Sequence, residues 1–223
     1  MSIRSAADQV DTKDVSDPTV RLAFIGNVHR LLALGYKRLD SRKYRKANEN
    51  LLTQDLAVAL RDVTQDMQSP RWTSYFSIHE KRKQNDGRLQ GNNRLELDVV
   101  FERTQRGSHP HFVMEAKRLG LSHPIGKYLG PEGLGAFISC EYAKEHDDAG
   151  MLGYVQSRTL DDWNSSLESR LATSPGRYSV EPTGTWQRYS FRGGPAMTYR
   201  SSHRRPTGHG PITIYHTLLD FNA

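Results

Sequence analysis

Three charged residues lie inside the two segments that look most like buried strands. The first segment, RLELDVVFE (94–102), contains Asp98. The second segment, HFVMEAKRL (111–119), contains Glu115 and Lys117. Apolar strands rarely accept unpaired charge, because removing an ionised group from water is costly. These residue types therefore indicate either a charged edge strand or a chemical site built on two neighbouring strands.

Strand geometry predicts how the three side chains meet. Residues two apart in a strand point to the same face, so Glu115 and Lys117 share a face and Ala116 points the other way. In a hairpin, Asp98 comes close to Glu115. Two adjacent carboxylates ionise reluctantly unless a cation lies between them. Oxygen ligands favour Mg²⁺ or Mn²⁺ over zinc. The pattern thus predicts metal-assisted hydrolysis of a phosphodiester, with Lys117 orienting a water or balancing phosphate charge.

An edge strand with a surface glutamate and lysine would give the same short string. The site interpretation is favoured because the triplet Glu115-Ala116-Lys117 follows HFVM inside a β-like run. The preceding β-like run also carries an acidic residue, Asp98.

The remaining chain predicts the elements that must position this site. Helical periodicity is present over 20–35 and 48–63, with Asn48 as a possible N-cap. Strands are expected over 72–81, 94–102 and 111–119, joined as an antiparallel meander. A helix from about Pro131, a strand over 150–157, a helix over 159–173 and a strand over 211–221 follow. This order predicts an α/β domain with a mixed sheet, in which the strand after the next helix is parallel to a neighbour.

Length and composition bound the class of protein. The 223 residues are 36% hydrophobic and 25% charged, which is typical of a soluble globular chain. We expect a flexible lead over 1–18 and a single domain over 19–223. The lead is polar and predicts no secretory signal, and we find no apolar run of about 18 residues for a membrane span. The single cysteine, Cys140, excludes an intramolecular disulfide and a cysteine-based zinc cage. These features together predict a cytoplasmic location without membrane partners.

Basic clusters suggest a polyanionic partner. The formal net charge is +6, and three basic runs stand out. Such runs are often only solvated faces, but three in one small domain favour nucleic acid. The candidate nucleic-acid-binding residues are Lys43, Arg45, Lys81, Arg82, Lys83, Arg204 and Arg205. The last two belong to the string YRSSHRRP, expected to be a substrate-facing loop, in which His203 could touch a phosphate.

The strings ELDVVF and FVMEAKRL resemble the PD-(D/E)xK nuclease superfamily, and the resemblance covers most of the chain. It implies a restriction-endonuclease-like αβββαβ core with a mixed sheet flanked by helices. It also implies that Asp98 and Glu115 are metal ligands, with the backbone carbonyl of Ala116 assisting. Lys117 would be the catalytic lysine, and Mg²⁺ or Mn²⁺ the cofactor. Leu97 stands where the proline of the family motif is usual.

The third ligand has several candidates. Many members of that superfamily carry a glutamate on the leading helix, a place that Glu49 matches. A glutamate in the first turn of a helix also stabilises the helix dipole without any further role. Glu96 shares the strand face of Asp98 and is an alternative third carboxylate, and Glu80 is another candidate.

The resemblance implies a metal-dependent endonuclease that hydrolyses DNA, with RNA as the other substrate. Members of the superfamily restrict foreign DNA, repair it, or act as anti-phage defence effectors. A lone small domain favours a restriction or defence effector with partner subunits. A homodimer would suit the cutting of two antiparallel strands. The alternative is a catalytically silent nuclease-like module that binds nucleic acid or a partner protein, and a third possibility is another phosphoryl-transfer role of the same site.

Overall fold

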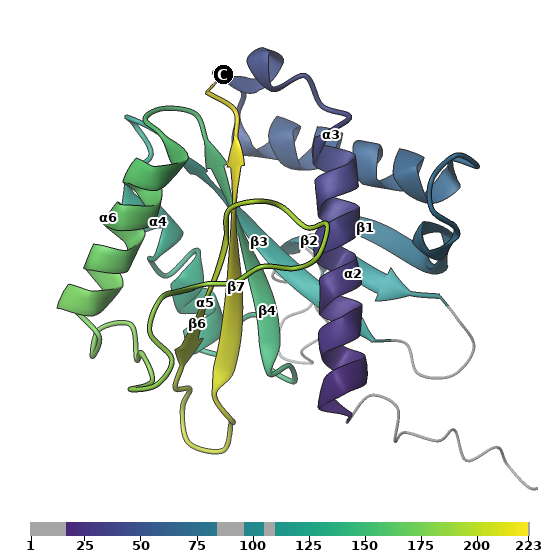
Figure 1. Ribbon diagram of the computed structural model, residues 1–223. Coiled ribbons are helices and arrows are strands. Elements are labelled where there is room, and N and C mark those ends of the chain that lie inside the picture. Colours follow the sequence, from purple (N-terminus) through teal and green to yellow (C-terminus); the bar gives the residue numbers. More distant parts are fainter. Residues whose placement is uncertain (1–16, 84–95, 105–109, 223) are drawn as a thin grey trace, which may run out of the picture.

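A seven-stranded mixed sheet forms the centre of the molecule (Figure 1). The computed structural model describes residues 17–83, 96–104 and 110–222. The chain begins with helix α2 (Pro18–Tyr36), the 3-10 helix η1 (Ser41–Tyr44), α3 (Glu49–Gln65) and η2 (Arg71–Tyr75). Strands β1 (Phe76–Lys83), β2 (Glu96–Arg103) and β3 (His111–Leu119) follow. The second half contains α4 (Ile125–Tyr128), α5 (Leu134–Ile138), β4 (Asp148–Val155), α6 (Leu160–Thr173), β5 (Gln187–Arg188), β6 (Thr198–His203) and β7 (Ile212–Asp220).

The strand order is β1-β2-β3-β4-β7-β6-β5. The first three strands form an antiparallel meander, β4 is parallel to β3, and β7 is parallel to β4. The last three strands return to antiparallel pairing. The expected meander and the expected parallel strand after it are both confirmed. Helices α3, α4 and α5 precede or follow the meander in the order that the sequence predicted, although two short helices replace one longer one.

Helices cover both faces of the sheet and enclose two apolar cores (Figure 1). The first core joins α2 and α3 to one face through residues such as Leu56, Phe101 and Met114. The second core joins α4, α5 and α6 to the other face through Leu119, Phe137 and Trp163. Successive residues of β3 alternate between the two cores, as the two-residue period of a strand requires. A central strand of this kind is buried on both faces, so any charge within it needs a specific partner.

The helix ends follow local sequence signals. The side chain of Asn48 accepts from the backbone N–H of Leu51 at 2.8 Å, which confirms it as the N-cap of α3. Thr159 and Asp162 form a reciprocal capping box at the start of α6. Within the described chain, no helix is both long and apolar enough to cross a bilayer.

Three expectations about secondary structure are wrong. The helix expected from Pro131 is reduced to the five residues of α5, because the backbone turns left-handed at Cys140 and Ala143. The strand expected from residue 72 begins at Phe76, after a 3-10 turn. The first five residues of the segment expected as a basic loop (199–206) belong to β6, which pairs with β7 and buries alternate side chains, and Arg204 and Arg205 follow the strand. Residues 1–16 of the expected flexible lead lie outside the described residues.

Candidate active site

The site forms where β2 and β3 stop pairing. The last backbone pair of the ladder is Val99 with Met114, so Asp98 and Glu115 would be the next pair. Instead, Asp98 Oδ2 accepts a hydrogen bond of 2.8 Å from the backbone N–H of Ala116. This bond ties the beginning of β2 to β3 through a carboxylate. The predicted proximity of Asp98 and Glu115 is therefore present.

Lys117 lies between two carboxylates. Its ammonium is 2.6 Å from Glu115 Oε1 and 3.3 Å from Glu49 Oε1. The other oxygen of Glu49, Oε2, accepts from the backbone N–H of Arg118 at 3.0 Å. Glu49 is the first residue of α3, and the Asn48 cap fixes that end of the helix. The helix terminus thus holds both the lysine side chain and the backbone of β3.

Burial makes this cluster electrostatically unusual. Glu115 is only 3% exposed, and its Oε2 has no hydrogen-bond partner among the described residues. Burial, with the Asp98 carboxylate beside it, raises the pKa of Glu115 to about 8. Burial also raises the pKa of Asp98. For Lys117, burial opposes the charge, but the carboxylates of Glu115 and Glu49 raise the lysine pKa above its ordinary value. The site therefore holds excess negative charge that one ammonium only partly offsets.

Tyr142 is a neighbour of the site that the sequence did not single out. It lies in the segment between α5 and β4, where Cys140 and Ala143 both have positive φ. Its ring packs edge-on against Phe137, with centroids 5.6 Å apart, and its backbone N–H donates to Ala136. Burial and the charge of Glu115 raise the pKa of the Tyr142 phenol to about 12. No spacing rule points to Tyr142, because the segment was expected to be a regular helix.

The predicted metal ligands can be compared with this geometry. Asp98, Glu115 and the carbonyl of Ala116 lie at one place on β2 and β3, whereas both oxygens of Glu49 already bind Lys117 and Arg118. Within the described part of the chain, no group of three or more His, Cys, Asp or Glu residues is placed to hold a metal ion. Mg²⁺ is commonly bound by one or two carboxylates and keeps several waters. The buried Glu115 with its unpaired oxygen and the half-buried Asp98 fit such a two-carboxylate site.

The other carboxylate candidates lie apart from this pair. Glu96 is exposed at the beginning of β2. Glu80 is 3.4 Å from Arg61 of α3, so it takes part in an ion pair on the neighbouring strand. Neither position supplies a third carboxylate in the geometry described here.

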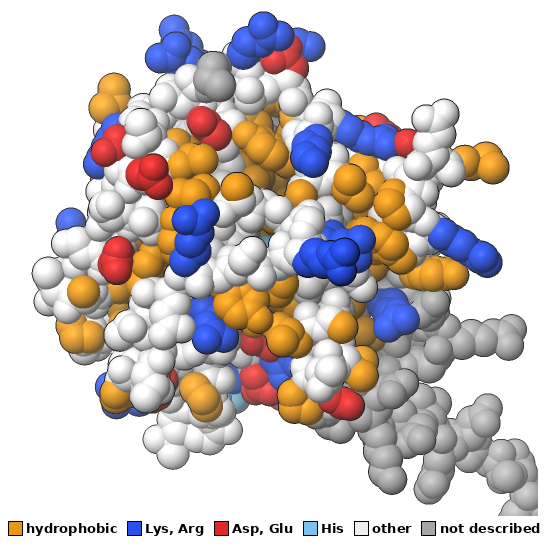
Figure 2. All heavy atoms as spheres, viewed as in Figure 1, with side chains coloured by type: hydrophobic (Ala, Val, Ile, Leu, Met, Phe, Trp, Pro, Cys, Tyr) orange, Lys and Arg blue, Asp and Glu red, His pale blue; other side chains and the backbone are white. Residues whose placement is uncertain are grey.

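The candidate nucleic-acid-binding residues are dispersed. Lys43 and Arg45 are exposed at η1, where Figure 2 shows basic side chains gathered at the top of the molecule. Lys81 is exposed with a positive φ of 49°, next to Glu80 in β1. Arg82 and Lys83 belong to β1, but their side chains lie outside the described part of the structure. Nucleic-acid binding by these residues stays a prediction.

The basic end of β6 differs from the expectation. Arg204 is exposed and lies 3.9 Å from Glu181. The Arg205 side chain is only 2% exposed, and it donates to the carbonyls of Gly210, Ala143 and Lys144. Arg205 thus holds the segment that carries Tyr142, an arrangement that does not support a direct substrate contact. His203 is fully buried and donates or accepts within the core, so it does not lie in a substrate-facing loop.

Comparison with protein-family models, with curated proteins and with solved structures found no match to this chain.

Proposed function

We propose that this chain is a metal-dependent nuclease that hydrolyses phosphodiester bonds in DNA, through a PD-(D/E)xK-type site. The observation that carries the proposal is the convergence of Asp98, Glu115 and Lys117 at the point where β2 and β3 separate. The site combines the buried carboxylate of Glu115, which has an unpaired oxygen, with the half-buried carboxylate of Asp98 and a fixed cation. Raised carboxylate pKa values of this kind are typical of functional sites.

Each residue has a distinct proposed role. Asp98 and Glu115 would hold Mg²⁺ or Mn²⁺, with the Ala116 carbonyl as a further oxygen donor. Bound there, the ion would polarise the phosphate and lower the pKa of a coordinated water. Among the described residues, the Lys117 ammonium donates to Glu115 and Glu49, which leaves one N–H for a phosphate oxygen or the attacking water. A charge fixed in this way stabilises the transition state without reorganising during the reaction.

Glu49 acts as a positioning residue in this scheme. It holds the Lys117 ammonium from one side and the backbone of Arg118 from the other. Loss of either contact would let the lysine side chain move, and a small displacement of a catalytic group is costly in rate.

A catalytically silent binding module is the second candidate. The observation that favours it is the Lys117 ammonium between Glu49 and Glu115, where it partly neutralises the carboxylates without any metal. Such a module would bind nucleic acid in EDTA, with a strong dependence on salt, and would form no product.

The test is a cleavage assay on supercoiled plasmid, single-stranded DNA and RNA, each with Mg²⁺, Mn²⁺ or EDTA. The Asp98→Asn protein is compared with an Asp62→Asn control, since Asp62 is a carboxylate of α3 away from the site. We expect metal-dependent DNA cleavage that only Asp98→Asn abolishes. Cleavage that persists in EDTA, or in folded Asp98→Asn protein at the wild-type rate, would contradict the proposal. Salt-dependent binding of nucleic acid in EDTA, with no product under any metal condition, would favour the silent module.

A further inference from the structure

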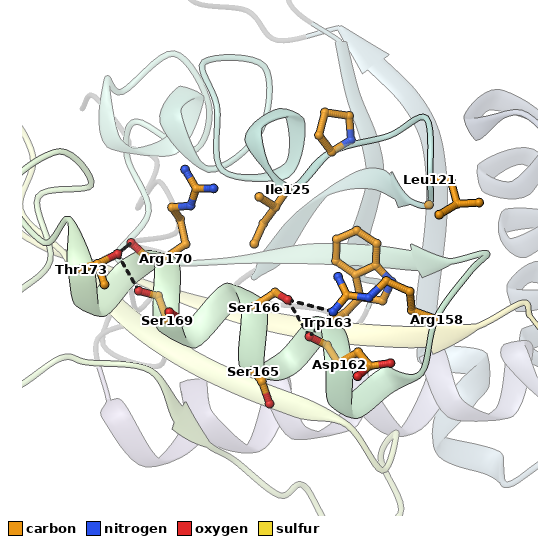
Figure 3. Close-up of a pocket in the computed structure, with 12 residues that line it drawn as sticks. Leu121, Ile125, Arg158, Asp162, Trp163, Ser165, Ser166, Ser169, Arg170 and Thr173 are labelled. Carbon is orange, nitrogen blue, oxygen red and sulfur yellow. Dashed lines mark hydrogen bonds between the residues drawn. The ribbon is translucent and has the colours of Figure 1, made fainter.

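A groove of about 640 Å³ lies between α6 and the segment that follows β3 (Figure 3). One wall consists of α6, and the other contains Gly120, Leu121 and Ile125. Leu121 is 91% exposed at the rim. Arg158 and Arg170 stand at opposite ends of the groove, with Ser166 and Ser169 between them in Figure 3.

The groove lies on the same sheet face and at the same sheet end as the candidate active site. Leu119 belongs to the core that also contains Trp163, and Ile125 packs against that core. Lys117 precedes Leu119 by two residues on the same strand face, a distance of about 7 Å along β3. The groove-lining residue Gly120 directly follows β3, and Arg158 lies three residues beyond the end of β4. A polymer bound at the site could therefore continue into the groove.

Arg158 is held in place before any ligand binds. Its guanidinium carbon lies 4.9 Å from the centroid of the Trp163 ring, and one of its nitrogens donates to Asp162 O and Ser166 Oγ. Its backbone has a positive φ of 62°, and its carbonyl accepts from the side chain of Asn222. The remaining guanidinium N–H groups form a preorganised donor set, of the kind that binds phosphate oxygens well.

Arg170 supplies the second cation. It is exposed in the last turn of α6, and its guanidinium has no acceptor within the described part of the chain. The rise along the helix from Asp162 to Arg170 is about 12 Å. That span matches about three nucleotides of a stacked strand, at about 3.4 Å each.

Of the acidic residues Asp161, Asp162 and Glu168 of α6, only Asp162 lines the groove, where its carboxylate offsets part of the charge of Arg158 and leaves that of Arg170. The Asp162 carboxylate accepts the backbone N–H of Thr159 in the capping box, at the positive end of the helix. Asp161 and Glu168 act on the Tyr199 phenol, so they lie on the side of α6 toward β6. The groove therefore presents two arginines and serine hydroxyls to a ligand, together with the Asp162 carboxylate beside Arg158.

We propose that this groove binds the sugar–phosphate backbone of a single nucleic-acid strand that extends from the bond held at Lys117. The choice of nucleic acid rests on the proposed function. A groove of this volume has the size of a small-ligand pocket, so it accommodates a few nucleotides of one strand but not a duplex. Arg158 and Arg170 contact phosphates, and the exposed Leu121 covers the sugar or base edge.

The test measures binding of a fluorescein-labelled single-stranded oligonucleotide by anisotropy in EDTA, over a range of salt concentrations. We expect the Arg158→Ala/Arg170→Ala protein to bind at least tenfold more weakly than wild type. Two lost phosphate contacts should also reduce the magnitude of the salt slope by about 1.4. The matched control is Arg192→Ala/Arg200→Ala, which removes the same charge at two exposed positions outside the groove.

Arg158 has internal contacts, so Arg170→Glu alone provides a second test at an exposed position. The inference is overturned if folded Arg170→Glu protein binds the strand as tightly as wild type, or if the control pair loses as much affinity. It is also overturned if the groove variants lose duplex binding but retain single-strand binding.

Cleavage separates the two proposals. If wild type cuts no substrate but the groove variants lose single-strand binding, only the proposal of nuclease activity is contradicted. Cleavage by wild type together with unchanged binding and cutting by the groove variants would contradict only the groove.

Discussion

Replacement of Glu115 by glutamine should stabilise the metal-free protein as pH rises. The wild-type carboxyl is 3% exposed, and burial with the neighbouring Asp98 raises its pKa from 4.5 to about 8. The folded state therefore retains a proton that the unfolded chain has released. For such a group, the stability is complete below pH 4.5 and is lost as pH rises toward 8. Glutamine has nearly the same shape and cannot ionise, so the variant avoids this loss.

The magnitude follows from the distance between the two pKa values. Between pH 4.5 and 7, a loss of about 1.4 kcal/mol per pH unit gives about 3 kcal/mol for Glu115 alone. The difference in stability between Glu115→Gln and wild type should grow by that amount over this range. For a chain of this length, about 3 kcal/mol corresponds to a change of about 6 to 12 °C in the difference between their melting temperatures. The contact with Lys117 affects both proteins at every pH, so the growth with pH is the informative quantity.

The assay is thermal unfolding in EDTA at several pH values, with wild type, Glu115→Gln and a Glu132→Gln control. Glu132 is an exposed glutamate, so its replacement should give a difference that is nearly constant with pH. Excess Mg²⁺ or Mn²⁺ should then stabilise wild type, by about 2.7 kcal/mol at one hundred times Kd, and leave Glu115→Gln almost unchanged. A Glu115→Gln difference that stays constant with pH would refute the reasoning, because Glu115 would then ionise normally.

Three further predictions concern stability and positioning. Burial lowers the pKa of His29 from 6.5 to about 4, so this residue lowers the free energy of unfolding as pH falls through that range. Between pH 7 and 4, His29→Phe should therefore lose about 3 kcal/mol less stability than wild type in denaturant unfolding. Equal losses in the two proteins would contradict this. Gly35→Ala should lower stability by about 1 to 3 kcal/mol, because the added Cβ would lie 2.7 Å from a methyl carbon of Leu60, and a higher melting temperature would refute the clash. Asn48→Ala should cost about 1 kcal/mol of stability through the lost cap and should reduce the cleavage rate further by loosening Glu49, whereas a lower melting temperature with an unchanged rate would contradict the positioning role.

The part of the site that depends on local pattern could be predicted from the sequence. The second and third strands of the meander both show a two-residue period, and Asp98 and Glu115 lie on either side of the turn that joins them. This pattern was enough to predict that the two carboxylates lie close together. The N-cap at Asn48 was visible for the same reason, since capping depends on residues only a few positions apart. The parallel placement of β4 follows from a crossover that must return to the sheet.

The parts that the sequence could not predict depend on distant contacts. Glu49 meets Lys117 only because α3 packs with its first turn beside the end of β3, 68 residues later in the chain. Tyr142 lies close enough for the charge of Glu115 to act on its phenol, in a segment with positive φ at Cys140 and Ala143 that Arg205 holds by a hydrogen bond to the Ala143 carbonyl. The basic string that starts at Tyr199 was expected to be a loop, yet pairing of β6 with β7 buries Tyr199, Ser201 and His203. Pairing partners of this kind are set by tertiary structure.

The most direct test of the central claim is single-turnover DNA cleavage by Lys117→Met protein, with enzyme in excess and Mg²⁺ saturating. Methionine keeps much of the buried side-chain volume and removes the ammonium that lies between Glu115 and Glu49. The account predicts that wild type cuts in a metal-dependent manner and that Lys117→Met loses at least a hundredfold in rate, consistent with the loss of a transition-state contact, while it stays folded. Cleavage by folded Lys117→Met protein at the wild-type rate would contradict the claim that this cluster is the catalytic site.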